Sequence, residues 1–92
     1  MAEGTIFARE QRSLAQEALG LDHPITLSLA HSLCMFLGDG DNLAEAVTLM
    51  RDTFQRQRRL LGPTHPDTRV SELDFQGFKV RMSRAGIAEE VD

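Results

Sequence analysis

Apolar residues recur at helical spacing through the middle of the chain. Within residues 24–38 they cover most of a helix circumference, so this helix must be covered on more than one side. They are Ile25, Leu29, Ala30, Leu33, Cys34, Phe36 and Leu37. Within residues 42–61 they form a single stripe opposite charged residues, as in an amphipathic helix. This stripe consists of Leu43, Ala46, Val47, Met50 and Phe54. The pattern predicts two antiparallel helices, 24–38 and 42–61.

A polar turn separates these two helices. The run Gly-Asp-Gly-Asp at residues 38–41 interrupts the apolar pattern. Asn42 and, three residues later, Glu45 resemble a capping box, in which two side chains satisfy the free backbone N–H groups of a helix start. We therefore expect the second helix to begin at residue 42.

An eight-residue segment occurs twice in the chain. Residues 19–26 and 61–68 share the frame Leu-Gly-x-x-His-Pro-x-Thr, with five identical positions at a period of 42 residues. The glycine of each copy can adopt the positive φ that ends a helix. The proline of each copy suits the first position of a helix, where a backbone N–H is not needed. Each copy therefore predicts a junction between two helices.

The two flanking segments predict one further helix each. The upstream stripe, expected within a helix at 4–20, consists of Phe7, Leu14, Ala15, Ala18 and Leu19. The downstream apolar residues are Val70, Leu73, Phe75, Phe78, Val80 and Met82. Residues 78–82 alternate between apolar and charged types, which also suits a strand. We assign a helix at 66–84 because the repeat requires one, and the predicted fold class is all-α.

Composition narrows the classes of function. The chain has 92 residues, enough for one small domain, and a net charge of −4, which disfavours nucleic-acid binding. Cys34 is the only cysteine, so neither an intrachain disulfide nor a zinc site with several thiolates can form. No signal-peptide pattern and no apolar run of about 18 residues occurs. We expect a cytoplasmic protein that does not enter a membrane.

The junction sequences resemble a known family. Leu-Gly-Pro-Thr-His-Pro-Asp-Thr at 61–68 and Asn-Leu-Ala-Glu-Ala at 42–46 are similar to the 42-residue tetratricopeptide repeat of kinesin light chains. The resemblance implies a short right-handed solenoid of antiparallel helix pairs, about two repeats long and incomplete at both ends. The implied units are a partial repeat at 1–25, a complete repeat at 26–67 and a degenerate partial repeat at 68–92.

The resemblance also assigns packing positions. Leu33, Cys34, Leu37 and Ala46 would lie where the two helices of the complete repeat approach closely. The third copy departs from the pattern, because Gln76 replaces an expected small residue and Lys79 an expected aromatic or aliphatic one.

Members of this family bind segments of partner proteins in a groove lined by the first helix of each repeat. The resemblance therefore implies a non-catalytic module that binds a protein or peptide, without a cofactor, metal, nucleic acid or small-molecule substrate. The positions that correspond to groove residues are Ser28, His31, Met35, Gly38, Asp39, Val70, Leu73, Gly77, Val80 and Arg81.

An alternative is a structural or oligomerisation element, or a fragment of a longer repeat protein. Solenoid repeats bury their faces against neighbours, and about three are usually needed for stability. With two, we expect some apolar side chains to be partly exposed in a monomer, and the chain to self-associate or to lie beside further repeats. These side chains are Leu29, Phe36, Phe75 and Phe78.

The terminal sequence Glu89-Glu90-Val91-Asp92 supplies a second alternative. It resembles the last four residues of cytosolic heat-shock chaperones, whose carboxylates dock into a basic clamp on other tetratricopeptide domains. This tail would make the chain the ligand of such a domain.

Other candidate chemistry is weaker. His31 and Cys34 lie three residues apart, but a catalytic thiol needs a substrate cleft, and Cys34 occupies a packing position. His23 and His65 are expected to be junction or cap residues and not metal ligands. Acidic residues 39, 41 and 45 resemble a calcium loop only superficially, because Leu43 stands where an oxygen ligand is required. The basic run at 56–59 is expected to be solvated.

Overall fold

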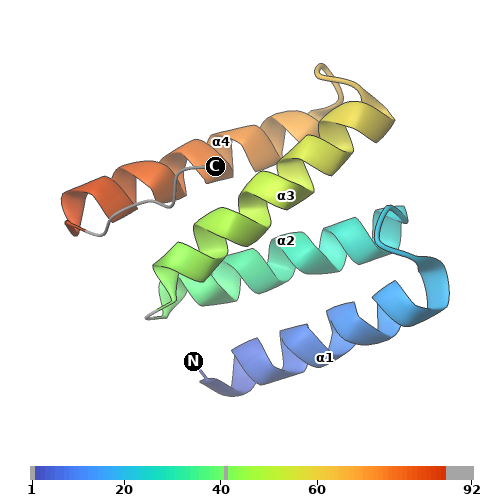
Figure 1. The fold of residues 1–92 in the computed structure, drawn as a ribbon, viewed down its shortest axis with the longest axis horizontal. Helices are drawn as coiled ribbons and strands as arrows, with labels where there is room; N and C mark the ends of the chain where they lie inside the picture. The colour runs from blue at the N-terminus through green and yellow to red at the C-terminus, as the bar shows by residue number, and fades with distance from the viewer. Residues whose placement is uncertain (1, 41, 87–92) are drawn as a thin grey trace.

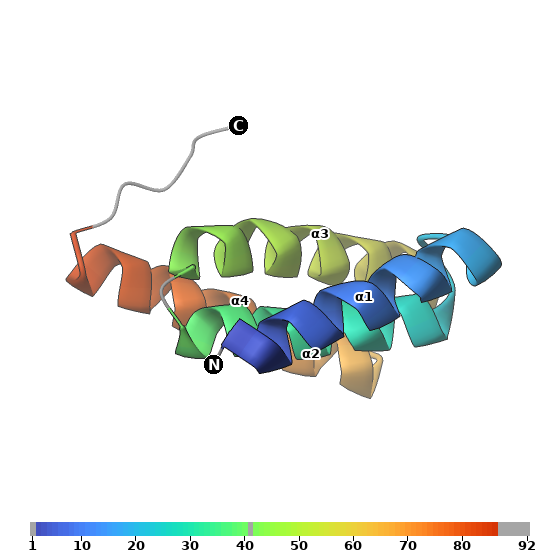
Figure 2. The same ribbon diagram turned by 90° about the horizontal axis from the view of Figure 1, so that it is seen from below.

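Four helices make up the described chain (Figure 1). The computed structural model describes residues 2–40 and 42–86. The helices are α1 (Ala2–Leu19), α2 (Pro24–Asp39), α3 (Leu43–Leu61) and α4 (Pro66–Arg84). Each packs against the next in sequence, and α2 and α4 lie on the same side of α3 (Figure 2). Within the described residues there is no strand, so the all-α fold of about two helical repeats is confirmed, and the strand alternative at 78–82 is wrong.

The two repeated junctions have the same geometry. Gly20 and Gly62 end α1 and α3 with φ of 92° and 96°. His23 and His65 then cap the following helices, since the Nδ1 atom of each accepts a 3.1 Å hydrogen bond from the backbone N–H two residues later. Each cap satisfies one of the free N–H groups of a helix start, so the histidines of the frame are structural residues.

The capping box expected at Asn42 and Glu45 does not form. Asn42 precedes α3 but makes no side-chain cap hydrogen bond. Glu45 points instead toward α1, where its two carboxylate oxygens accept hydrogen bonds of 2.6 and 2.7 Å from Arg9. The bidentate guanidinium–carboxylate pair gives Glu45 two charge-assisted hydrogen bonds, whereas the capping box would give its carboxylate one, so the tertiary contact displaces the local one. This pair also lowers the pKa of Glu45 through the hydrogen bonds from Arg9.

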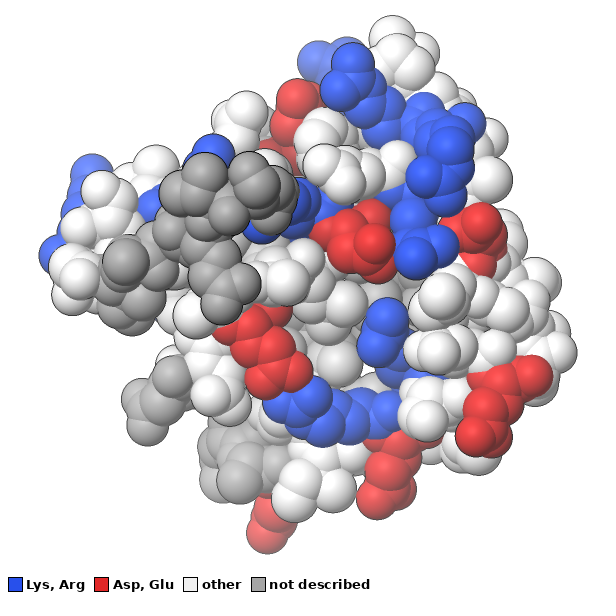
Figure 3. All heavy atoms as spheres, in the orientation of Figure 1, with Lys and Arg blue, Asp and Glu red and all other residues white. Residues whose placement is uncertain are grey.

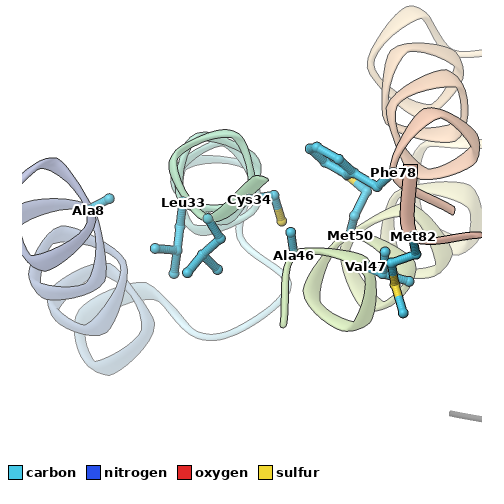
Figure 4. Packing of buried hydrophobic residues seen from close by; sticks show 9 residues of the cluster. Ala8, Leu33, Cys34, Ala46, Val47, Met50, Phe78 and Met82 are labelled. Carbon is cyan, nitrogen blue, oxygen red and sulfur yellow. The ribbon is translucent and has the colours of Figure 1, made fainter. Parts of the chain in front are cut away.

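The apolar core lies where the C-terminal halves of α2 and α4 meet the N-terminal half of α3 (Figure 4). Its buried members are Ala8, Leu33, Cys34, Leu37, Ala46, Val47, Met50, Phe78 and Met82. The small residues Cys34 and Ala46 are both fully buried, which allows α2 and α3 to approach closely. All four packing positions assigned from the family resemblance lie in this core.

One expectation about exposed apolar residues is wrong. Phe78 is 5% exposed, because its ring packs against the backbone of α2 at Gly38. Phe75 is partly buried and stacks on Phe54, with 6.2 Å between ring centroids. Phe36 remains 39% exposed, as expected. Among the described residues, no helix combines the length and the apolar character that a bilayer crossing requires.

The contact at Gly38 generates a prediction with a matched control. A Cβ atom at Gly38 would lie 2.3 Å from the Phe78 ring, whereas one at Gly77 of α4 would meet nothing within 4 Å. Gly38→Ala should therefore lower the free energy of unfolding by about 1–3 kcal/mol through overpacking. Gly77→Ala should raise it by about 0.5–1 kcal/mol, since alanine is the better helix former.

Urea unfolding followed by circular dichroism measures both changes. Equal stabilities of the two variants would contradict the packing of Phe78 on α2.

Candidate functional site

A pocket opens between the N-terminal halves of α2 and α4. It has a volume of about 390 Å³, within the range of small ligand sites. Its apolar lining consists of Pro24, Leu27, Leu60, Leu61 and Val70. Its polar lining consists of Asp22, Ser28, His31, Gln57, Asp67 and Ser71. The pocket can therefore hold a short aliphatic group and offer it hydrogen bonds.

The repeated junctions build this pocket. Asp22 and Pro24 belong to the first Leu-Gly-x-x-His-Pro-x-Thr segment, and Leu61 and Asp67 belong to the second. The two segments end α1 and α3 and begin α2 and α4. The repeat thus brings two equivalent helix starts to one site.

Gln57 is the polar group buried at this site. The residue is 5% exposed, and its Oε1 atom has no hydrogen-bond partner. A buried amide oxygen without a donor costs about 1–3 kcal/mol, so a ligand that brings an N–H group can recover this loss. Sequence reasoning missed Gln57 because it treated the residue as part of the basic run at 56–59, which was expected to be solvated. The available signal was its position on one stripe with Ala46, Met50 and Thr53.

Only part of the predicted groove lines the pocket. Ser28, His31 and Val70 do so, and the Nε2 atom of His31 lies 2.7 Å from a carboxylate oxygen of Asp74 on α4. The predicted residues outside the pocket lining are Met35, Asp39, Leu73, Val80 and Arg81, all exposed, and Gly38 and Gly77.

Two of the predicted groove positions hold α2 and α4 together. Gly38 is buried beneath the ring of Phe78. Arg81 donates a 2.6 Å hydrogen bond to the carbonyl oxygen of Gly38, and its guanidinium carbon lies 5.6 Å from the centre of the Phe78 ring. These contacts give both residues a structural part at the floor of the groove.

Charged side chains near the pocket are paired with one another. Arg56 donates to Asp22 at 2.7 Å and to Asp52 at 2.9 Å, and these hydrogen bonds raise the pKa of Arg56. Arg59 lies 3.5 Å from Asp22. Figure 3, which views the molecule with α3 in front of α2 and α4, shows acidic side chains among the basic ones. Within the basic run at 56–59, Arg56 and Arg59 are engaged in ion pairs.

The thiol–imidazole pair considered from the sequence does not form. Cys34 is fully buried, and burial raises the pKa of its thiol to about 12, because a thiolate would lose its hydration. His31 is bonded to Asp74 instead. Among residues 2–40 and 42–86, no cluster of three or more His, Cys, Asp or Glu side chains could hold a metal ion. Residues 89–92 and Asp41 lie outside the described residues.

Residues 26–67 match the family model of the tetratricopeptide repeat. The match supports a tetratricopeptide-repeat protein. The matched residues contain most of α2 and all of α3. Tetratricopeptide repeats mediate protein–protein interaction. No curated protein and no solved structure matches the chain.

The buried thiol yields a prediction about reactivity. Iodoacetamide should label Cys34 at pH 8 only as fast as the chain unfolds, because the pKa of the folded thiol is about 12 and the sulfur has no access to solvent. Mass spectrometry with and without 6 M urea measures the two rates. Native labelling as fast as that in urea would contradict the burial of Cys34.

Proposed function

We propose that the chain is a non-catalytic module that binds a peptide segment of another protein in the groove between α2 and α4. The pocket beneath the two junctions anchors this segment. The observation that carries the proposal is the pocket itself, which joins an aliphatic lining to the unpaired Oε1 atom of Gln57.

The lining favours a particular chemistry of ligand. Leu27, Leu60 and Val70 suit an aliphatic side chain of the peptide. Rotation of the Gln57 amide presents its oxygen to an N–H donor of the same peptide. Of the two carboxylates in the lining, that of Asp22 is paired with Arg56 and Arg59, and that of Asp67 disfavours an anionic group beside it. An aliphatic residue beside a backbone or side-chain N–H group is the expected anchor.

The finer identity belongs to the same proposal. The Leu-Gly-Pro-x-His-Pro-Asp-Thr junction at 61–68 supports the kinesin-light-chain type of repeat. The single buried thiol, Cys34, is compatible with a reducing, cytoplasmic location.

A selection experiment tests the groove. A display library of short random peptides is selected on the immobilised chain, and the dissociation constants of the enriched peptides are measured by fluorescence anisotropy. Leu60→Asp, which places a charge in the pocket, should weaken binding by roughly tenfold or more. Met35→Asp should weaken the binding of those peptides that extend along α2.

Ile6→Asp is the matched control for these variants. Ile6 is 57% exposed and lies on α1 away from the pocket, so its substitution should change neither binding nor helix content. Enriched peptides that bind all three variants as well as the unmodified chain would contradict the proposed groove.

Gln57 provides a second prediction, in which stability and peptide binding change in opposite directions. Gln57→Leu removes the unpaired buried oxygen, so the free energy of unfolding without ligand should rise by about 1–3 kcal/mol. The same change should weaken the binding of the selected peptides, because their N–H groups lose the Gln57 oxygen as an acceptor. Thermal melts with and without peptide measure both effects.

Thr53→Val is the control for this pair of effects, because the Thr53 hydroxyl is buried but already bonded to the carbonyl oxygen of Leu49 at 2.9 Å. It should leave peptide binding unchanged. A loss of stability in Gln57→Leu would show that the amide oxygen has a partner in the free protein.

A further inference from the structure

The two outer helices carry exposed apolar residues on faces that no other described helix covers. On α1 these are Phe7 and Leu14, which are 62% and 60% exposed. On α4 they are Leu73 and Val80, at 68% and 48%. Large apolar side chains gathered on a face usually mark an interaction surface.

The repeat relates the internal contacts to one another. Phe36 of α2 packs on α1 at Gly4, where a Cβ atom would lie 2.7 Å from its ring. One repeat period later, Phe78 takes the place of Phe36 and Ala46 takes the place of Gly4, and both belong to the core cluster. Both pairs of positions are therefore used for packing between helices, and the contacts of α2 indicate which contacts α4 is able to make.

We propose that the chain self-associates head to tail, with α4 of one copy packed against α1 and α2 of a second copy. Within one chain, α2 packs against α3 and meets α4 through the contact between His31 and Asp74. The equivalents of α3 and α4 one period earlier are α1 and α2. The α1 and α2 helices of the second copy would hold α4 of the first in the same register.

This register brings three of the exposed apolar residues, Val80, Leu73 and Phe7, into the contact. The contact between Gly38 and Phe78 becomes a contact between Val80 and Phe36 of the second copy. Leu73 lies one period after His31, and Asp74, the hydrogen-bond partner of His31, lies one period after Ser32. Leu73 would therefore lie beside Ser32 of the second copy. Phe7 of the second copy takes the position of Leu49, which packs against the core cluster.

The register also pairs opposite charges. Arg9 of α1 and Glu45 of α3 form an ion pair of 2.6 Å. One period along, the same two positions are occupied by Arg51 of the first copy and Glu3 of the second. Both residue types are kept, and Glu3 is exposed in the first turn of α1. A head-to-tail contact would therefore repeat an ion pair that the chain already forms between its own helices.

Three substitutions limit the strength of this contact. Val80 replaces Gly38, so the half-exposed ring of Phe36 must turn to avoid it. Gln76 and Lys79 replace Cys34 and Leu37 and place polar groups at the interhelix packing positions. The contact is therefore weak and reversible. It is also heterologous, so it propagates into an open series of oligomers and does not stop at a dimer.

Sedimentation velocity of the full chain over a hundredfold range of concentration tests the proposal. The sedimentation coefficient should rise continuously with concentration. Arg51→Glu and Glu3→Arg should each raise the apparent dissociation constant by roughly fivefold or more, because each places like charges opposite one another. The Arg51→Glu, Glu3→Arg double variant should recover the original association, since the pair is restored with its charges exchanged.

Arg58→Glu is the charge-matched control and should leave association nearly unchanged, because Arg58 is an exposed residue of α3 at none of the positions paired above. A chain that stays monomeric throughout, a species that stops at a dimer, or a double variant no better than either single one would overturn the proposal.

A second pair of variants tests the same register in the opposite direction. Gln76→Ala with Lys79→Leu restores small and apolar residues at the packing positions, and should tighten association by roughly tenfold or more. Gln55→Ala with Arg59→Leu makes the same change of charge and a similar gain of apolar surface on the exposed side of α3. Equal tightening by both pairs would mean non-specific hydrophobic aggregation and would overturn the register.

Discussion

The close approach of α2 to its neighbours is the constraint on which the groove depends. On one side, the small residues Cys34 and Ala46 allow α2 to pack on α3. On the other, Gly38 leaves the space that the Phe78 ring occupies. Because Phe78 also reaches the core cluster, a single ring joins α4 to both other helices. The angle between α2 and α4, and with it the mouth of the pocket, is set by side chains at the far end of those helices.

The described chain separates its packing into two halves. The apolar cluster lies at the C-terminal halves of α2 and α4. Around the pocket, at their N-terminal halves and on the facing part of α3, five of the buried positions are polar, beside the apolar Leu27 and Ala30. The polar ones are Thr26, Thr53, Gln57, Thr68 and Ser71. Hydrophobic burial therefore stabilises one end of the helix pair, and the other end carries the pocket with incompletely satisfied hydrogen-bonding groups.

Much of the fold could be predicted from the sequence because its determinants are local. The Gly and Pro of the repeated frame fix where helices end and begin, and the repeat period orders them. Reasoning from neighbouring residues failed where a side chain found its partner far away in the sequence. Glu45 pairs with Arg9 and not with the backbone beside it, and Phe78 is buried against a glycine of another helix, Gly38. The groove positions were transferred from the family, but the amide of Gln57 was not among them.

The buried polar residues around the pocket lower the stability of the free chain, but they are the groups that the proposed peptide binding requires. A fully apolar layer at Thr26, Gln57 and Thr68 would stabilise the free chain, because each of these side chains leaves a buried oxygen without a partner. It would also remove the acceptor that distinguishes a peptide from any other apolar ligand. Since specificity comes from groups that are unpaired until the ligand arrives, the least stable part of the helix pair is the part best suited to recognition. The apolar cluster at the other end provides the stability that this arrangement requires.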